Sequence, residues 1–217
     1  MNAAQANNKD VTRDSREVMI PGKLRFLEDL LWEWVAIQER SIRLWKGKDA
    51  LWWYNERVSV GGFAGAIWKS GGIVLEEYST EKFDGGGAPT KTAKTVIGRG
   101  DMDFFLGGRQ FTMEAKQCWS RVKIKKVKDA LAQADRDLTR CQRPGRYVRL
   151  AVVFAALSLT GRSTESDIAE WTRQARELKD CARAWVFPGG GRNLSFSWGD
   201  NHRFYPGVGV FVKRVGS

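Results

Sequence analysis

The sequence is short of several residue types on which many enzymes depend. Its 217 residues include one histidine, three cysteines and five prolines. A single histidine excludes, within one chain, zinc centres built from several histidines and catalytic mechanisms that need a histidine pair. The one histidine, His202, lies in the polar stretch SWGDNHRFYP. We expect an ordinary surface histidine there rather than a general base.

The cysteines Cys118, Cys141 and Cys181 are far apart, and no C-x-x-C pair occurs. This spacing argues against a structural zinc site and against a disulfide framework, and it is typical of proteins in a reducing cytoplasm. The polar start of the sequence lacks the apolar segment of a signal peptide. The longest apolar stretch, residues 148–159, has the length of a strand rather than of a membrane span. We therefore expect a cytoplasmic protein without a membrane segment.

Negative charge is also in deficit, because 25 Asp and Glu stand against 36 Lys and Arg, a net charge of +11. The hydrophobic content of 42% is enough for a core, which excludes a disordered basic tail. A folded domain with this excess favours a polyanionic partner, usually nucleic acid, over a role in general solubility or at an anionic membrane surface. The sequence contains no G-x-x-x-x-G-K-[ST] motif, so we expect no nucleotide hydrolysis by the chain itself.

Three regions follow from the pattern along the chain. Residues 1–20 are polar and predict a flexible arm, and residues 21–54 predict a helical N-terminal extension. Residues 55–217 predict the main domain. The extension carries an apolar stripe at helical spacing, formed by Leu27, Leu30, Leu31, Trp34, Val35 and Gln38.

The main domain alternates between helical and strand patterns. Helices are predicted over 56–69, 120–140 and 165–180, and strands over 73–78, 101–106, 109–117, 147–157, 182–187 and 207–215. Residues 81–95 predict a basic, glycine-rich loop. This order indicates an α/β fold, a mixed sheet flanked by helices.

The most informative segment is DMDFFL-GG-RQFTMEAKQ, residues 101–117. Gly107 and Gly108 between two alternating runs predict a hairpin. A two-residue turn pairs residues whose numbers sum to 215, which places Asp101 opposite Glu114 and Asp103 opposite Thr112. The ionisable side chains then lie on one face of the sheet and the apolar ones on the other.

Directly opposed carboxylates have Cβ atoms about 5 Å apart and repel each other unless a cation lies between them. Carboxylate oxygens are ligands suited to Mg²⁺ or Mn²⁺. Lys116 is expected beside the same site. The hairpin therefore predicts a divalent-metal site, against the alternative of an ordinary surface salt bridge.

This segment, with the elements around it, resembles the PD-(D/E)XK nuclease superfamily, which has the restriction-endonuclease-like fold. The resemblance covers residues 56–157 and rests on the order helix, strand, hairpin with an acid and then E-x-K, helix, strand. It implies that Glu114 is the metal-binding acid of the triplet and Lys116 its lysine. The acid of the preceding strand is either Asp101 or Asp103, with Asp101 favoured by the register.

The resemblance also implies a further acid on the helix before the first strand, for which Glu56 is the candidate. Glu76 or Glu77 on the strand 73–78 could also approach the metal. Each of these acids could equally be an ordinary surface residue. Gln133 is expected to be a plain helix residue, and Gln117 is expected to point to the opposite face from Lys116.

The reaction that the resemblance implies is Mg²⁺-dependent hydrolysis of DNA phosphodiester bonds, with RNA as a second candidate substrate. Two alternatives stay open: a catalytically inactive nucleic-acid-binding or assembly module with this fold, and a dimeric, structure-specific nuclease that resembles resolvases. The side chains expected to contact the nucleic-acid backbone are Arg99, Arg121, Lys123, Lys125, Lys126 and Lys128, with Lys91 or Lys94 on the glycine-rich loop.

Overall fold

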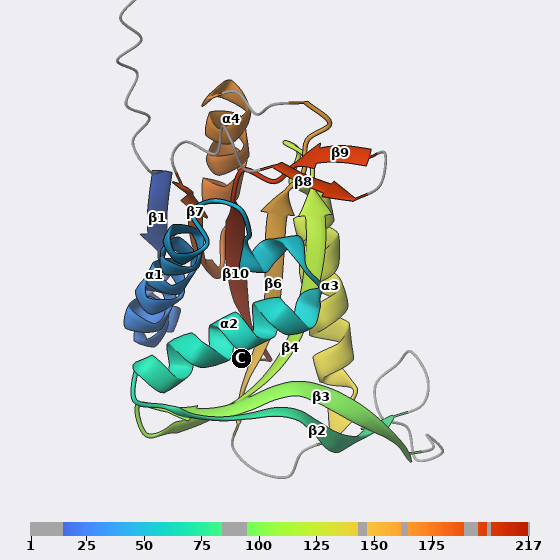
Figure 1. Cartoon of the computed structure of the whole chain (residues 1–217). Coiled ribbons are helices and arrows are strands. Elements are labelled where there is room, and N and C mark those ends of the chain that lie inside the picture. The colour runs from blue at the N-terminus through green and yellow to red at the C-terminus, as the bar shows by residue number, and fades with distance from the viewer. Residues whose placement is uncertain are drawn as a thin grey trace, which may run out of the picture.

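The computed structural model describes residues 15–83, 95–142, 147–161, 165–188, 195–198 and 201–216. Within this part of the chain, eight strands form one mixed sheet in the order β1-β7-β10-β6-β4-β3-β2-β5, and β8 and β9 form a separate hairpin. Helices cover both faces of the sheet (Figure 1). The predicted α/β class is therefore confirmed.

The helices begin and end close to the predicted positions. α2 spans Glu56–Lys69, as predicted, and Asn55 caps its first turn by accepting a hydrogen bond from the Val58 N–H. The remaining helices are η1 (Gly22–Leu27), α1 (Glu28–Leu44), η2 (Leu51–Trp53), α3 (Lys125–Thr139) and α4 (Glu165–Arg176). α3 begins five residues later than the pattern predicts, because Ser120 still belongs to a strand and residues 121–124 form a turn.

The strands include every predicted one and several that were missed. Their bounds are β1 (Ser15–Met19), β2 (Ile73–Phe83), β3 (Thr95–Leu106), β4 (Arg109–Ser120), β5 (Cys141–Gln142), β6 (Val148–Leu157), β7 (Cys181–Phe187), β8 (Ser195–Trp198), β9 (Asn201–Phe204) and β10 (Val208–Val215). β2 and β3 are longer than predicted and take residues 81–83 and 95 from the expected loop. Residues 84–94 lie outside the described part.

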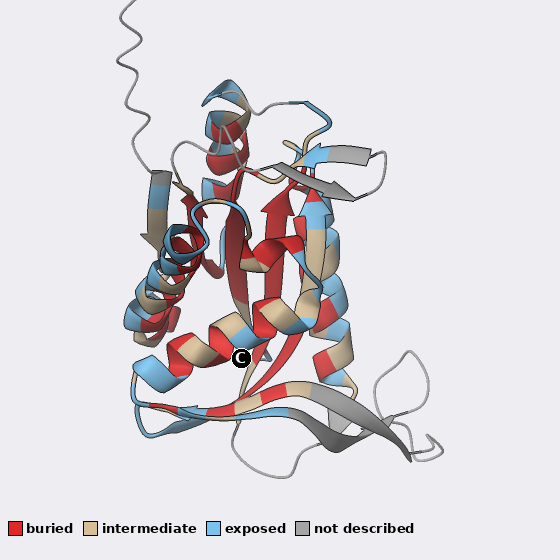
Figure 2. Ribbon diagram, in the orientation of Figure 1, coloured by how far each residue is buried: buried red, intermediate tan, exposed pale blue. Residues whose placement is uncertain are grey.

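The core has two layers, one on each face of the sheet (Figure 2). α1 and α2 pack on one face, where Trp34 and Phe63 contact Phe154 of β6. α3 and α4 pack on the other face, where Trp171 contacts Trp185 and other aromatic rings. β6 is buried on both faces, as its continuous apolar sequence predicts.

The predicted hairpin register is confirmed for residues 102–106, whereas the predicted pair of Asp101 with Glu114 lies beyond the end of this strand pairing. Leu106 pairs with Arg109, Asp103 with Thr112 and Met102 with Met113, and the numbers in each pair sum to 215. Gly107 and Gly108 both have positive φ, at 55° and 74°, a backbone conformation that favours glycine. The turn therefore fixes the relative positions of β3 and β4.

Two predictions about the N-terminal region need correction. Ser15–Met19 does not belong to a flexible arm, because it forms β1, antiparallel to β7, with Arg16 paired to Glu39 and Glu17 to Arg176. Residues 1–14 lie outside the described part. The helix α1 is not a separate extension, because Leu31, Trp34 and the rest of its apolar stripe share one core with the sheet.

The polar stretch around His202 contains the end of β8 and all of β9. The two strands are antiparallel, and His202 pairs with Ser197; the side chain of His202 is outside the described part. No helix among the described residues is long and apolar enough to cross a membrane.

Candidate active site

The candidate site forms where β3 leaves β4. Pairing between the two strands ends at Met102 and Met113, so the N–H groups of Ala115 and Gln117, which point to the same side of β4, need other acceptors. Side-chain carboxylates take the place of β3 as the hydrogen-bond acceptors. Oδ2 of Asp101 accepts from Ala115 N at 2.6 Å, and Oε2 of Glu56 accepts from Gln117 N at 2.8 Å. Acids from β3 and α2 are thus fixed at the edge of β4.

Glu114 and Lys116 project from β4 toward α3. Nζ of Lys116 lies 3.1 Å from Oε1 of Glu114 and 3.2 Å from Oδ2 of Asp137 on α3. The Glu114 side chain is 6% exposed and that of Lys116 25%. The ammonium is therefore held between two carboxylates and keeps limited access to solvent.

The charges around Lys116 decide its protonation. Burial by itself lowers the pKa of Lys116, but the carboxylates of Glu114, Asp101 and Asp137 outweigh burial and hold the pKa above its ordinary value. Lys116 is thus a cation at neutral pH, suited to stabilising negative charge rather than to acting as a general base.

Glu56 belongs to the same electrostatic cluster. Burial raises its pKa, the nearby charge of Lys116 and the Gln117 N–H lower it, and Glu114 raises it further; the net pKa lies above the ordinary value. The helix α2 places Glu56 here through its first turn, directly after the Asn55 cap. Of the three predicted additional acids, Glu56 is the one that the described contacts bring to the hairpin.

The other predicted residues lie at varying distances from this cluster. Asp103 lies two residues along β3 from Asp101, opposite Thr112, and lines a pocket. Glu76 pairs with Met102, whose side chain is buried against α1 and α2, so Glu76 lies on the opposite face from Asp103. The flanking pairs place residue 77 opposite Asp101 along the strands, but the side chain of Glu77 is outside the described part.

The two glutamines are where the sequence places them. Gln133 is exposed on α3. The side chain of Gln117 points away from Lys116, toward α2, where it accepts a hydrogen bond from Ser59 Oγ at 2.9 Å and donates to the Tyr54 carbonyl. Gln117 thus ties β4 to the start of α2, next to Glu56.

The predicted phosphate-binding side chains after the hairpin are exposed: Arg121, Lys123, Lys125, Lys126 and Lys128. Lys125 binds Asp129 at 2.7 Å. Lys128 and Asp137 are nine residues apart on α3, about 14 Å along the helix axis, so the basic segment lies along α3 from Asp137, the partner of Lys116. The side chain of Arg99 and residues Lys91 and Lys94 are outside the described part.

The donor set suits a hard divalent cation. Asp101 and Glu114 both supply carboxylates that act on Lys116, and Mg²⁺ in proteins is commonly held by one or two carboxylates together with waters and substrate phosphate. In the described part of the chain, no three carboxylate, thiol or imidazole groups converge closely enough to enclose a metal ion by themselves. The residues present therefore fit an open magnesium site, completed by water and substrate, rather than a closed protein cage.

Asp137 is the residue that sequence reasoning missed. It lies on α3 between the buried positions Ala134 and Leu138, so its carboxylate borders the face that packs on β4. An acid at the border of an apolar stripe, facing a strand that carries a lysine, is the signal that could have identified it.

No family model matches the chain, and no curated protein matches it.

Proposed function

We propose that the protein is a metal-dependent nuclease that hydrolyses DNA phosphodiester bonds as an endonuclease. The observation that carries the proposal is the convergence of Asp101, Glu114 and Lys116 at the free edge of β4, in a chain of net charge +11. Two acids beside a protonated lysine suit a reaction in which negative charge develops on phosphate. The single histidine is consistent with a mechanism based on carboxylates and lysine.

Asp101 and Glu114 would hold the Mg²⁺ or Mn²⁺ ion. When bound, this ion supplies Lewis-acid activation of the phosphate and lowers the pKa of a coordinated water. Lys116 binds the scissile phosphate and stabilises the charge that develops on it. Asp137 is a positioning residue, since its carboxylate holds the Lys116 ammonium from the α3 side. Glu56 fixes the strand edge through the Gln117 N–H.

The substrate's backbone reaches beyond this cluster to the exposed basic segment 121–128. The separation of about 14 Å along α3 corresponds to about four base-pair steps of duplex at roughly 3.4 Å each. Basic side chains at that distance fix the register of a nucleic acid without contacting the scissile bond. Because they neutralise phosphates, binding is expected to weaken steeply with added salt.

The test is a cleavage assay with circular, linear and single-stranded DNA, and with RNA, in Mg²⁺, Mn²⁺ or EDTA. We expect cutting of circular DNA that requires the metal, and a loss of at least about 100-fold in Glu114→Gln and Lys116→Met. Glu33→Gln and Lys69→Met are matched controls, because these residues form an ion pair with each other between α1 and α2. Cleavage by Glu114→Gln at the wild-type rate would overturn the proposal.

A non-catalytic nucleic-acid-binding module is the second candidate, favoured by one observation. Asp101 and Glu56 accept backbone hydrogen bonds, a structural task that a carboxylate can perform without a metal. This candidate predicts salt-sensitive DNA binding with no metal-dependent cleavage in the same assay. Sedimentation, with cleavage of branched against linear DNA, separates a resolvase-like homodimer from a simple endonuclease.

A further inference from the structure

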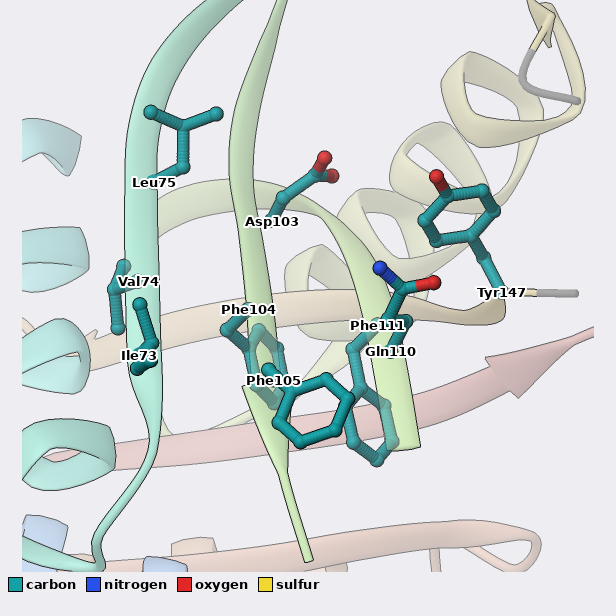
Figure 3. A pocket seen from close by; sticks show the side chains of 9 residues that line it. All are labelled: Ile73, Val74, Leu75, Asp103, Phe104, Phe105, Gln110, Phe111 and Tyr147. Atoms are coloured by element: carbon teal, nitrogen blue, oxygen red, sulfur yellow. The ribbon is translucent and has the colours of Figure 1, made fainter. Parts of the chain in front are cut away.

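A pocket of about 230 Å³ lies beside the candidate site, across β2, β3 and β4 (Figure 3). Strand register arranges its side chains in two rows. Ile73, Phe105 and Gln110 are directly paired across the three strands. The next row pairs Leu75 with Asp103, and Tyr147, the residue before β6, also lines the pocket.

The lining combines flat apolar surface with polar groups. Ile73 is 63% exposed, Leu75 56% and Phe105 46%. Large apolar side chains that are exposed together on one sheet face indicate a binding surface rather than an ordinary solvent-exposed surface. Asp103 carries a carboxylate within this apolar lining, as Figure 3 shows, and a carboxylate there accepts hydrogen bonds from a ligand's N–H groups. The pocket therefore suits a flat ligand with amino groups at its edge.

The pocket and the candidate site share one strand and one face. Asp101, Asp103 and Phe105 alternate along β3, and every second residue of a strand is about 7 Å further on. Asp103 thus lies one such step from Asp101, and Phe105 lies two steps from Asp101. A group bound on Phe105 lies within about two steps of a phosphate held at Asp101, Glu114 and Lys116.

We infer that this pocket binds an unpaired nucleobase of the nucleic-acid strand whose phosphate lies at the candidate site. Phe105 provides the stacking surface, as aromatic side chains do for single-stranded nucleic acids. Asp103 accepts from an exocyclic amino group, which thymine lacks. The net charge of +11 favours a polyanion over the acidic or apolar partners that an exposed apolar face could otherwise bind.

This inference rests on the proposed function and makes it more specific. A base inserted between Phe105 and the neighbouring side chains cannot remain stacked in a duplex. The preferred substrate is therefore single-stranded next to the scissile phosphate, as in a single strand, a flap or a branch, rather than a continuous duplex.

The test measures binding in EDTA, so that it does not depend on cleavage. Fluorescence anisotropy compares wild type, Phe105→Ala and Phe105→Leu on a labelled single strand and on the matching duplex. We expect Phe105→Ala to weaken single-strand binding by about tenfold or more, Phe105→Leu to weaken it less, and duplex binding to change less than twofold. Trp68→Ala, an exposed aromatic on α2, is the control and should bind both like wild type.

A second measurement concerns Asp103. Wild type should bind oligo-dC or oligo-dA more tightly than oligo-dT, and Asp103→Asn should reduce this difference. The inference would be overturned if Phe105→Ala lost binding equally on single strand and duplex, or if it bound the single strand like wild type. It would also be overturned if the wild type showed no preference among the bases. If Phe105→Ala loses single-strand binding while the wild type shows no metal-dependent cleavage, the pocket is supported and the proposed nuclease activity is refuted. The failure of one proposal can therefore be told apart from the failure of the other.

Discussion

The carboxylate of Asp101 crosses from β3 to accept a hydrogen bond from the backbone N–H of Ala115, 2.6 Å away. This contact continues the hairpin by one step after backbone pairing has ended at Met102 and Met113. It fixes the Asp101 carboxylate at the backbone of Ala115, the residue between Glu114 and Lys116 on β4. The geometry therefore distinguishes Asp101 from Asp103, which lies one step away in the pocket.

We predict that Asp101→Asn lowers the cleavage rate by at least about 100-fold and Asp103→Asn by less than tenfold. Asparagine retains an oxygen that can accept from Ala115, so the fold should persist while the charge that holds the metal is lost. Initial rates at saturating Mg²⁺, with circular dichroism as the folding control, measure the difference. The reverse order of the two losses would show that Asp103 is the principal ligand.

Asp137 should act through Lys116. Asp137→Asn removes one of the two carboxylates within 3.2 Å of the ammonium, and we expect kcat to fall by about tenfold. In Lys116→Met the loss should be larger, and adding Asp137→Asn to it should have no further effect, because the residue that Asp137 orients is gone. Multiplicative losses in the double variant would mean that Asp137 acts independently.

Glu56 should reduce stability at neutral pH. Burial raises its pKa in the folded protein, so ionisation favours the unfolded chain and stability falls as the pH rises from the ordinary value of 4.5 through the raised one. Glu56→Gln removes the charge and keeps an acceptor for the Gln117 N–H. We expect its Tm to exceed that of wild type at pH 7 to 8, with the difference shrinking toward pH 4. A variant that is less stable at every pH would contradict this account.

Cys118 should resist alkylation. Burial is the main cause that raises its pKa from 9.0 to about 12, against a smaller opposite effect of Lys126. At pH 8 its thiolate fraction is then roughly a thousandfold below that of an ordinary thiol. Iodoacetamide labelling followed by peptide mass spectrometry should show slow modification of the native protein and rapid modification in urea. Equal rates in the two conditions would be incompatible with this environment.

The basic segment should determine how binding depends on salt. Lys123→Ala and Lys126→Ala remove exposed cations, and each should reduce the slope of log K against log salt by about 0.9. Arg173→Ala is the control, because Arg173 is paired with Glu170 and Glu177 on α4. Anisotropy with duplex DNA at several salt concentrations provides the slopes, and an unchanged slope in the lysine variants would remove this segment from the interface.

The hairpin could be predicted because its determinants are local. Gly107 and Gly108 fix the turn, and a fixed turn sets which residue of β3 faces which residue of β4. The burial of Met113 and the inward direction of Gln117 follow from the same alternation. Periodicity likewise predicted α2 and most of α3, since both depend on the chain segment itself.

The missed features depend on contacts between distant segments. β1 and β9 are short strands: β1 pairs with β7, far along the chain, and β9 pairs with β8 in a polar stretch. Asp137 reaches Lys116 only because α3 packs on β4 in one particular rotation, and Tyr147 joins the pocket only because β6 lies next to β4. Sequence periodicity describes a helix or a strand alone and contains no information on how two of them are placed against each other.

The position of β10 has a consequence for how the protein is made. The sheet order places β10 between β6 and β7. The edges of β6 and β7 that pair with β10 therefore stay unpaired until the ribosome has released residues up to Val215. Folding during synthesis can therefore complete the β2–β3–β4–β6 half, but not the whole sheet. Until then β6, apolar on both faces, presents an unpaired strand edge of the kind that promotes aggregation.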